Sequence, residues 1–249
     1  MRFLILSDIH ANVEALEAVV AAVPAQAYEG LIVLGDLVGY GASPNEVVDR
    51  VFAMHPDISI RGNHDKVAAG LEPPHHFNEV AAVAALWTFQ TLTPENRSRV
   101  ANLRAGPVFV DEMTEICHGS PIDEDMYVFD PSDALRALEA SERPVCFFGH
   151  THNAVAFVLE GNRLDAIAPP LGATDATVIK LDAHRKYLIN PGSVGQPRDG
   201  DPRAAYAMYD TDRKEVRLSR VAYRVDLAQQ KITAAGLPDS LARRLGVGR

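Results

Sequence analysis

The fold is decided at the start of the chain, which runs Arg2-Phe3-Leu4-Ile5-Leu6-Ser7-Asp8-Ile9-His10. Residues 2–7 form a short apolar run, as is typical of a strand covered on both faces of a sheet. The segment between Asn12 and Pro24 then repeats apolar residues with the period of an α-helix, and Pro24 marks its end. A strand followed at once by such a helix predicts a β–α unit.

This alternation of strand and helix patterns continues through the first quarter of the chain. Residues 30–34 and 57–60 have strand patterns, and Ser43-Pro44 between them has the composition of a helix start. Strands joined by crossover helices form right-handed βαβ units. We therefore expect parallel pairing at this edge of a sheet.

The pattern changes after residue 65. Residues 66–105 are mostly helical in pattern and are expected to form a lid-like segment. Strand patterns then dominate, over residues 108–110, 115–117, 145–148, 154–159, 163–167, 176–181, 204–209 and 216–222. Two amphipathic helices are predicted within residues 226–249. Because no repeat or long linker interrupts the chain, we expect one α/β domain over residues 1–249, with two sheets.

Composition excludes several classes of protein. The 249 residues are 47% hydrophobic and 23% charged, which is typical of globular proteins and too apolar for disorder. The formal net charge of −9 argues against general nucleic-acid binding. No apolar run approaches the roughly 20 residues of a membrane helix. The four apolar residues after Arg2 are fewer than the about 7–15 of a signal-peptide core. Cys117 and Cys146 lie in apolar runs and are expected to be reduced core thiols, which favours a cytoplasmic location.

Five short polar clusters each lie where a predicted strand ends and a loop begins. They are Asp8-Ile9-His10, Gly35-Asp36, Gly62-Asn63-His64-Asp65, His118-Gly119 and Gly149-His150-Thr151-His152. Five of the nine histidines of the chain fall inside them. Sites in α/β folds form at the carboxyl ends of strands, so we expect the five clusters to converge on one rim.

The residue types in these clusters favour a metal site. Carboxylate, imidazole and amide oxygen together make a mixed ligand set for divalent transition metals. In Asp8-x-His10 and His150-x-His152, we expect both side chains to lie on one face of an extended segment. Seven residues are candidate ligands: Asp8, His10, Asp36, Asn63, His118, His150 and His152. One metal with an open position takes about three protein ligands, so seven favour two metals that share a bridging group.

A pair of metals about 3.5–4 Å apart suits in-line displacement at phosphorus, because it generates hydroxide near neutral pH and stabilises the attacking and leaving oxygens. His64 directly follows a candidate ligand, and we expect it to act as the general acid toward the leaving-group oxygen. Asp65 is expected to orient His64 and to stabilise its charge. His64 and Asp65 are thus the predicted catalytic residues.

Taken in order, the five clusters resemble the motif set of the calcineurin-like metallophosphoesterase superfamily. Residues 190–199, Asn-Pro-Gly-Ser-Val-Gly-Gln-Pro-Arg-Asp, resemble a later signature of its small prokaryotic phosphodiesterase branch, which is related to diadenosine tetraphosphatases. The resemblance covers nearly the whole chain. It implies an α/β fold, a four-layer αββα sandwich of two mixed β-sheets flanked by helices.

The resemblance also implies two ligand sets that share a bridging Asp36. One metal would take Asp8, His10, Asp36 and His152. The other would take Asp36, Asn63, His118 and His150. The implied cofactors are two divalent ions per chain, from among Mn, Fe, Zn, Ni, Co and Mg.

The leading hypothesis is an enzyme that hydrolyses a small phosphoester, above all a phosphodiester, through a metal-activated hydroxide and a histidine acid. The alternatives within the family are a phosphomonoesterase and a dinucleoside polyphosphate hydrolase. A non-catalytic protein-binding scaffold of the same fold is disfavoured by the complete set of ligands and His64. A peptidase is disfavoured because the sequence has no His-Glu-x-x-His.

Some residues around the clusters have two interpretations. Arg198 either contacts substrate phosphate, for which its forked guanidinium is suited, or braces its own loop. Tyr40 and Tyr127 either stack on a base or pack in the interior. His75 and His76 follow two prolines in a predicted loop over the site, where a role in a lid competes with plain surface exposure.

Overall fold

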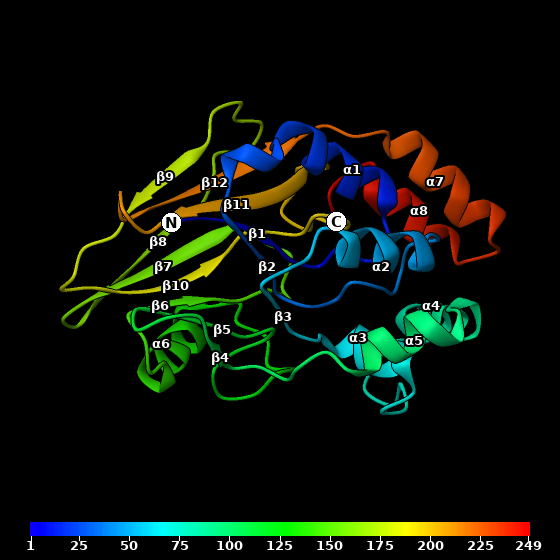
Figure 1. Cartoon of the computed structure of the whole chain (residues 1–249), viewed down its shortest axis with the longest axis horizontal. Helices are drawn as coiled ribbons and strands as arrows, with labels where there is room; N and C mark the ends of the chain where they lie inside the picture. Colours follow the sequence, from blue (N-terminus) through cyan, green and yellow to red (C-terminus); the bar gives the residue numbers. More distant parts are fainter.

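The computed structural model describes all 249 residues, and two six-stranded sheets packed face to face form its centre (Figure 1). The first sheet has the strand order β3 (Ile58–Ser59), β2 (Gly30–Val33), β1 (Arg2–Leu6), β11 (Ala204–Asp210), β12 (Glu215–Val221), β9 (Thr177–Lys180). The second has the order β4 (Val108–Phe109), β5 (Thr114–Ile116), β6 (Val145–Phe147), β10 (Lys186–Asn190), β7 (Val155–Glu160), β8 (Arg163–Ile167).

The pairing within each sheet brings the important strand ends to one edge. In the first sheet β1 pairs in parallel with β2, and β2 with β3, as the sequence predicts, while β1 pairs antiparallel with β11. In the second sheet β6 pairs in parallel with both β5 and β10. The carboxyl ends of β1 and β2 therefore lie together, and so do those of β5 and β6.

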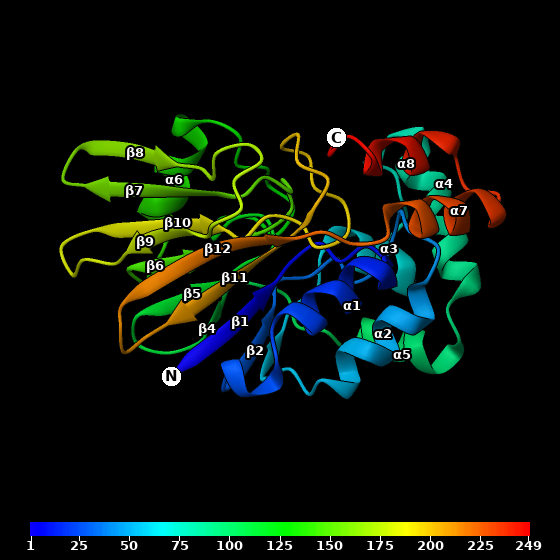
Figure 2. The same cartoon turned by 90° about the horizontal axis from the view of Figure 1, so that it is seen from above.

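Helices cover the outer face of each sheet. α1 (Val13–Ala22) and α2 (Pro44–Ala53) pack on the first sheet, and α6 (Pro131–Ala140) packs on the second (Figure 2). The Asn12 side chain accepts a hydrogen bond from the backbone N–H of Ala15 and so caps α1. The order helix, sheet, sheet, helix confirms the predicted four-layer sandwich of two mixed sheets.

The core explains why β1 is apolar at successive positions. Phe3 and Ile5 contribute to the buried cluster between the two sheets. Leu4 and Leu6 point the other way and contribute to the cluster beneath α1 and α2. Side chains alternate between the faces of a strand, so a strand covered on both faces needs apolar residues without a break.

The remaining helices lie at the end of the sandwich where β1 and β2 end (Figure 1). Residues 66–105 are mostly helical, as expected, and lie in α3 (Asn63–Ala69), α4 (Glu79–Thr91) and α5 (Pro94–Ala101). The chain ends with α7 (Val225–Ala234) and α8 (Asp239–Leu245). One apolar cluster joins α4 to α7 and α8 around the ring of Tyr40. A short 3-10 turn, η1 (Ala25–Ala27), follows α1.

Two elements were not predicted. β10 lies inside the second sheet between β6 and β7, and α6 begins at Pro131 behind a capping Asp130. Cys117 and Cys146 are buried and unpaired, in agreement with the expectation of core thiols. None of the helices combines the length and the apolar composition that crossing a bilayer requires.

Candidate metal centre

The structure brings the predicted ligands together in two buried groups that share Asp36. Asp8, His10, Asp36 and His152 form the first, and Asp36, His118 and His150 form the second. Within each group the potential ligand atoms lie within 4.8 Å of one another. Asn63 adjoins the second group, with its Oδ1 atom 3.3 Å from Nε2 of His118.

Asp36 lies between the two groups. Its Oδ2 atom is 3.5 Å from Nε2 of His10 in the first group and 3.4 Å from Nε2 of His118 in the second. Its other oxygen, Oδ1, accepts a hydrogen bond of 2.9 Å from the backbone N–H of His64. One carboxylate oxygen therefore faces both groups, which is the position of a bridging ligand.

The rings of His10 and His152 are oriented by backbone carbonyls. Nδ1 of His10 lies 3.1 Å from the oxygen of Val38, and Nδ1 of His152 lies 2.6 Å from the oxygen of Gln196. A carbonyl can only accept, so each Nδ1 carries the ring proton and each Nε2 of the neutral ring has a free lone pair. The two Nε2 atoms lie 3.0 Å apart. Facing lone pairs at this distance repel, and a divalent cation between the rings removes the repulsion, so these residues fit a metal.

His150 is turned the other way. Its Nε2 atom lies 3.0 Å from the backbone oxygen of Asp125, which leaves Nδ1 as the ligand atom. Burial lowers the pKa of His150 well below its ordinary value, as it does for His10 and His152. Neutral imidazole is the metal-binding form, so burial keeps these three rings ready to bind.

Charge in the centre is concentrated on two neighbouring residues. Burial acts to lower the pKa of His118, but the carboxylate of Asp36 outweighs burial and raises this pKa to about 10. Burial acts to raise the pKa of Asp36, but His118 and His64 hold it well below its usual value. Without metal, Asp36 and His118 thus form an ion pair, and a cation must displace the His118 proton. Burial also raises the pKa of Asp8 to about 6.

The backbone of the ligand loops corrects one prediction. Asp8, His10, Asp36, His150 and His152 all have positive φ, between 49° and 66°. Non-glycine residues seldom adopt this left-handed conformation, and clusters of it mark strained functional sites. The expectation that each pair lies on an extended segment is therefore wrong. Tight turns after the strands bring these side chains together.

Residues 190–199 support both ligand loops. The Asn190 side chain donates hydrogen bonds to the oxygen of Gly149, at 2.8 Å, and to Oγ1 of Thr151, at 3.0 Å. The Ser193 hydroxyl donates to the backbone oxygen of Asp8 at 2.7 Å. The sequence analysis did not assign Asn190 or Ser193 to the centre. The signal that could have indicated them was the segment rich in polar residues and glycine directly after β10, a strand that was not predicted.

His64 lines the cleft beside the metal centre. Its ring packs 4.2 Å from that of Tyr40 and 4.5 Å from that of Phe77, measured between centroids. Burial lowers its pKa to about 4, so the ring is neutral at pH 7. Its Nδ1 atom has no hydrogen-bond partner and faces Gly39, where an added Cβ would lie 2.5 Å from that nitrogen.

Asp65 does not contact His64 in the way the sequence predicts. Its Oδ2 atom accepts the N–H of Gly62 at 3.0 Å, and its Oδ1 atom accepts the N–H of Val38 at 3.2 Å. Successive residues of a helix point about 100° apart, because 3.6 residues make one turn, so neighbours in α3 face different partners. Asp65 ties the start of α3 to the loop after β2, and burial raises its pKa to about 7.

The cleft over the centre has a volume of about 580 Å³. Tyr127 stacks on His150 with ring centroids 3.8 Å apart. The lining includes three carboxylates, on Glu72, Asp123 and Asp125, and no lysine or arginine. Lys66 is neutralised by Asp125 at 2.6 Å, Glu124 at 3.2 Å and Glu72 at 3.4 Å.

The structure shows where the two tyrosines and the two histidines with open interpretations lie. Tyr40 packs against His10 and His64 and also lines the cleft, whereas Tyr127 is 42% exposed at its rim. His76 lines the cleft beside Phe77. His75 is exposed and is not part of the lining.

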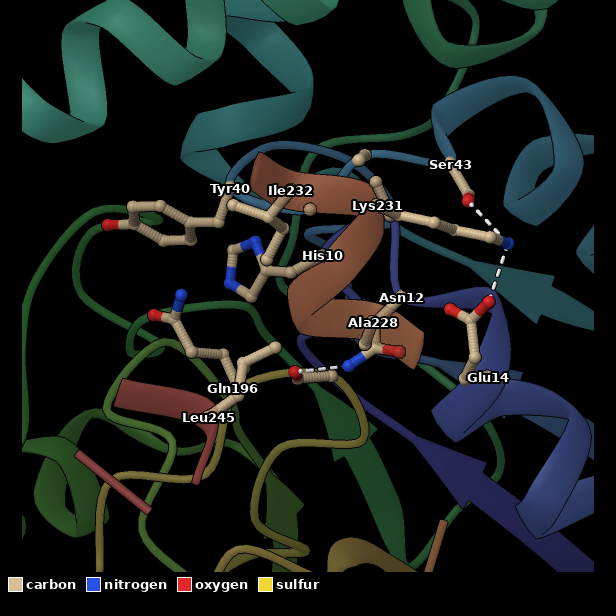
Figure 3. A pocket seen from close by; sticks show the side chains of 14 residues that line it. His10, Asn12, Glu14, Tyr40, Ser43, Gln196, Ala228, Lys231, Ile232 and Leu245 are labelled. Atoms are coloured by element: carbon tan, nitrogen blue, oxygen red, sulfur yellow. Dashed lines mark hydrogen bonds and ion pairs between the residues drawn. The ribbon is translucent and has the colours of Figure 1, made fainter. Parts of the chain in front are cut away.

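Behind His10 lies a second, much smaller cavity of about 10 Å³ (Figure 3). This volume is at the lower limit for one water molecule. Lys231 of α7 closes one side through bonds to Glu14, at 2.5 Å, and Ser43, at 3.4 Å. Leu245 of α8 closes another. The C-terminal helices therefore pack directly behind the metal centre.

A two-sheet αββα sandwich with two carboxylate–imidazole groups around a shared aspartate has the fold and site of a metal-dependent hydrolase. The family model of the calcineurin-like phosphoesterase superfamily domain matches residues 1–214. The chain belongs to this superfamily and is a metallophosphoesterase, which confirms the resemblance seen in the motifs.

Three individual proteins are similar to this chain over nearly its whole length. The metallophosphoesterase from Sphaerobacter thermophilus is 38% identical, with a TM-score of 0.85 and 100% of both chains covered. The uncharacterized protein MJ0912 of Methanocaldococcus jannaschii is 34% identical over 98% of this chain and 97% of its own length. The hypothetical protein PH1004 from Pyrococcus horikoshii OT3 shares the fold, with a TM-score of 0.76 at 20% identity, over 100% of this chain and 98% of its own.

Proposed function

We propose that the protein hydrolyses small phosphodiesters with two divalent ions held by the candidate ligands. The observation that carries this proposal is the position of Asp36 Oδ2, within 3.5 Å of a histidine nitrogen in each group. When bound, such ions supply hydroxide near neutral pH and offset negative charge on the phosphate oxygens. The candidate ions are Mn, Fe, Zn, Ni, Co and Mg, and the imidazole ligands favour the transition metals among them.

The residues divide into two ligand sets with a common member. Asp8, His10 and His152 would hold one ion together with Asp36. Asn63, His118 and His150 would hold the other, again with Asp36. The carbonyls of Val38 and Gln196 accept hydrogen bonds from Nδ1 of His10 and His152, and the Ser193 hydroxyl donates one to the oxygen of Asp8. These bonds fix the orientation of the rings and loops of the first set.

We assign to His64 the role of protonating the leaving group. It lines the cleft and is neutral at pH 7, so it carries one ring N–H. We propose that this N–H bonds the leaving oxygen. The proton that passes to the departing alcohol comes from the imidazolium form of the ring, which the negative charge of the bound phosphate favours and which becomes neutral in the transfer. Asp65 has a supporting role, because its carboxylate holds the start of the helix that carries His64.

The charge of the cleft favours diesters. A monoester dianion carries one more negative charge than a diester, and it would meet the carboxylates of Glu72, Asp123 and Asp125 with no lysine or arginine in the lining. Tyr127 and Phe77 offer aromatic surface to an aryl or nucleoside group. A protein-binding scaffold would have no use for the buried lone pairs of His10 and His152.

The test compares bis-p-nitrophenyl phosphate with p-nitrophenyl phosphate on chelated protein reloaded separately with Mn²⁺, Zn²⁺, Ni²⁺ and Mg²⁺. We expect metal-dependent turnover, with kcat/KM about ten-fold or more higher for the diester, equivalent to about 1.4 kcal/mol. Equal or higher kcat/KM for the monoester would overturn the diester preference. No turnover with any metal would favour the scaffold.

A charge variant tests the reason for this preference. Glu72→Gln removes one negative charge from the cleft, and we expect it to raise kcat/KM for the monoester about two- to three-fold relative to the diester. Glu79→Gln is the matched control, because Glu79 begins α4 but does not line the cleft. An unchanged ratio in Glu72→Gln would show that rim charge does not select the substrate.

A further inference from the structure

Two arginine side chains meet beside Tyr40. Nη2 of Arg198 donates a hydrogen bond of 2.9 Å to Oε1 of Gln196, and Nη1 of Arg244 donates one of 3.3 Å to the same oxygen. The two guanidinium carbons lie 5.5 Å and 6.0 Å from the centroid of the Tyr40 ring. A single amide oxygen and a single aromatic ring thus hold two positive charges close together.

Neither charge is neutralised by the protein. Arg203 and Arg220 form ion pairs with Asp201 and Asp199 respectively, whereas Arg198 and Arg244 form none. Nε of Arg198 is buried and has no hydrogen-bond partner. Burial and the positive charge of Arg198 both lower the pKa of Arg244. Two adjacent cations without a carboxylate repel each other, and an anion bound between them would remove that cost.

The arginine pair lies next to the metal centre. The backbone N–H of Arg198 donates to the oxygen of His152 at 3.2 Å, and Tyr40 lines the cleft. Figure 3 shows Tyr40 and Gln196 on the walls of the small cavity behind His10. The lining of the cleft itself includes three carboxylates and has no lysine or arginine. Apart from the proposed metal ions, the arginine pair therefore offers an anionic group beside the scissile phosphate two cations that no carboxylate neutralises.

Arg244 reaches this position because α8 is anchored. Leu241 and Leu245 of that helix are buried in the apolar cluster that contains Tyr40. The helix lies beyond residues 1–214, the part of the chain that the family model matches. The C-terminal helices thus add a charged side chain to a site that the superfamily domain supplies.

We propose that Arg198 and Arg244 form a subsite for a second oxyanion of the substrate, a phosphate group distinct from the diester that is hydrolysed. Guanidinium groups present paired N–H donors that match phosphate oxygens. This proposal rests on the proposed phosphodiesterase function and narrows its substrate class to diesters that carry one further phosphate.

Binding of inorganic phosphate to the chelated protein tests the subsite without any catalysis. We expect titration calorimetry to show binding to the wild-type protein, and an affinity about ten-fold or more lower in Arg244→Gln and in Arg198→Gln. Arg243→Gln is the matched control, because Arg243 is exposed on the same helix. Wild-type affinity in Arg244→Gln would overturn the proposal.

Kinetics with a matched pair of substrates tests the role of the subsite. The pair is the p-nitrophenyl ester of thymidine 5′-phosphate with and without a 3′-phosphate. We expect the wild-type protein and Arg243→Gln to show a KM about ten-fold lower for the 3′-phosphorylated ester. In Arg244→Gln the two KM values should converge with kcat retained, and Arg244→Lys, which keeps the charge, should restore part of the difference.

The outcomes separate the two proposals. Hydrolysis of both esters with equal KM in the wild-type protein and in Arg244→Gln would overturn the subsite and leave the phosphodiesterase function standing. Hydrolysis of neither ester with any metal would contradict the phosphodiesterase function, and the phosphate titration would still decide the subsite. A melting temperature of Arg244→Gln equal to that of Arg243→Gln shows that the loss is not one of folding.

Discussion

The Nε2 atoms of His10 and His152 lie 3.0 Å apart in the buried centre, and each ring has its proton on the opposite nitrogen, bonded to a backbone carbonyl. No hydrogen can lie between them while both rings are neutral. The structure therefore holds two lone pairs against each other, and five ligand residues adopt a left-handed backbone conformation in the same place. A cation that binds here stabilises the folded state, because it binds the unfolded chain far more weakly.

Chelation should accordingly destabilise the protein. We expect removal of divalent ions to lower the melting temperature by about 5 °C or more, since 1 kcal/mol corresponds to about 2–4 °C in a chain of this size. His152→Ala should be less sensitive to chelation, whereas the control His184→Ala, an exposed turn residue, should respond like the wild type. Equal sensitivity of His152→Ala and wild type would contradict a role for His152 in metal binding.

Replacement of the shared aspartate should affect both ions. Asp36→Asn keeps the shape of the side chain but removes its charge, and we expect bound metal to fall from two ions per chain to one or fewer. Phosphodiester turnover should fall about 100-fold or more. Elemental analysis after dialysis measures the metal content, with the exposed Asp165→Asn as control. Full retention of metal would count against the bridging position.

Variants of His64 should separate hydrogen bonding from proton transfer. His64→Ala should keep both metals and lose about 10²–10⁴-fold in turnover of esters with poor leaving groups, with a smaller loss for nitrophenolate. His64→Gln retains an N–H donor but cannot act as an acid. If Gln restores activity on poor leaving groups, His64 acts by hydrogen bonding alone. Equal losses on good and poor leaving groups would argue against any role at the leaving oxygen.

The stability of the metal-free protein should fall as pH rises. The pKa of His118 is about 10 in the folded protein, against an ordinary value of 6.5, so the protonated form is favoured by folding. This contribution is complete below pH 6.5 and is lost as pH rises toward 10. Burial also raises the pKa of Asp8 to about 6 and that of Asp65 to about 7. Folding therefore favours the protonated form of these two carboxyl groups as well, so they too make the folded protein less stable as pH rises, over a lower pH range.

Thermal melts at pH 7, 8.5 and 10, with and without Mn²⁺, measure this effect. The chelated protein should lose melting temperature across the range, whereas the metal-loaded protein should lose less, because a metal would take the place of the His118 proton. A chelated protein that is as stable at pH 10 as at pH 7 would show that Asp36 and His118 are not paired in the absence of metal.

The residue patterns predict two sheets and a parallel edge because these signals are local, whereas the four-layer sandwich is what the family resemblance implies. The unbroken apolar run of β1 follows from burial on both faces, and the parallel edge follows from the crossover helices. β10 and α6 were missed although each carries a signal, an apolar core in residues 187–189 and a capped Pro131. Short patterns such as these are easily passed over between stronger ones.

The sequence predicts which side chains lie close together better than how they are brought together. The seven candidate ligands lie in one region, but five of them lie on left-handed turns rather than on extended segments. Nothing in a residue pair two positions apart reveals the sign of φ. The partners of Asp65 depend on the loop after β2, which is distant in sequence. Arg244 is brought to Tyr40 by the packing of α8, a tertiary contact without a local signal.

The central claim is that two ions act together across Asp36. The most direct measurement is a titration of chelated protein with Mn²⁺, in which bound metal and turnover of bis-p-nitrophenyl phosphate are followed in the same samples. We predict that turnover stays low up to one ion per chain and reaches its plateau at two. Full turnover at one ion per chain, or turnover without metal, would contradict the account.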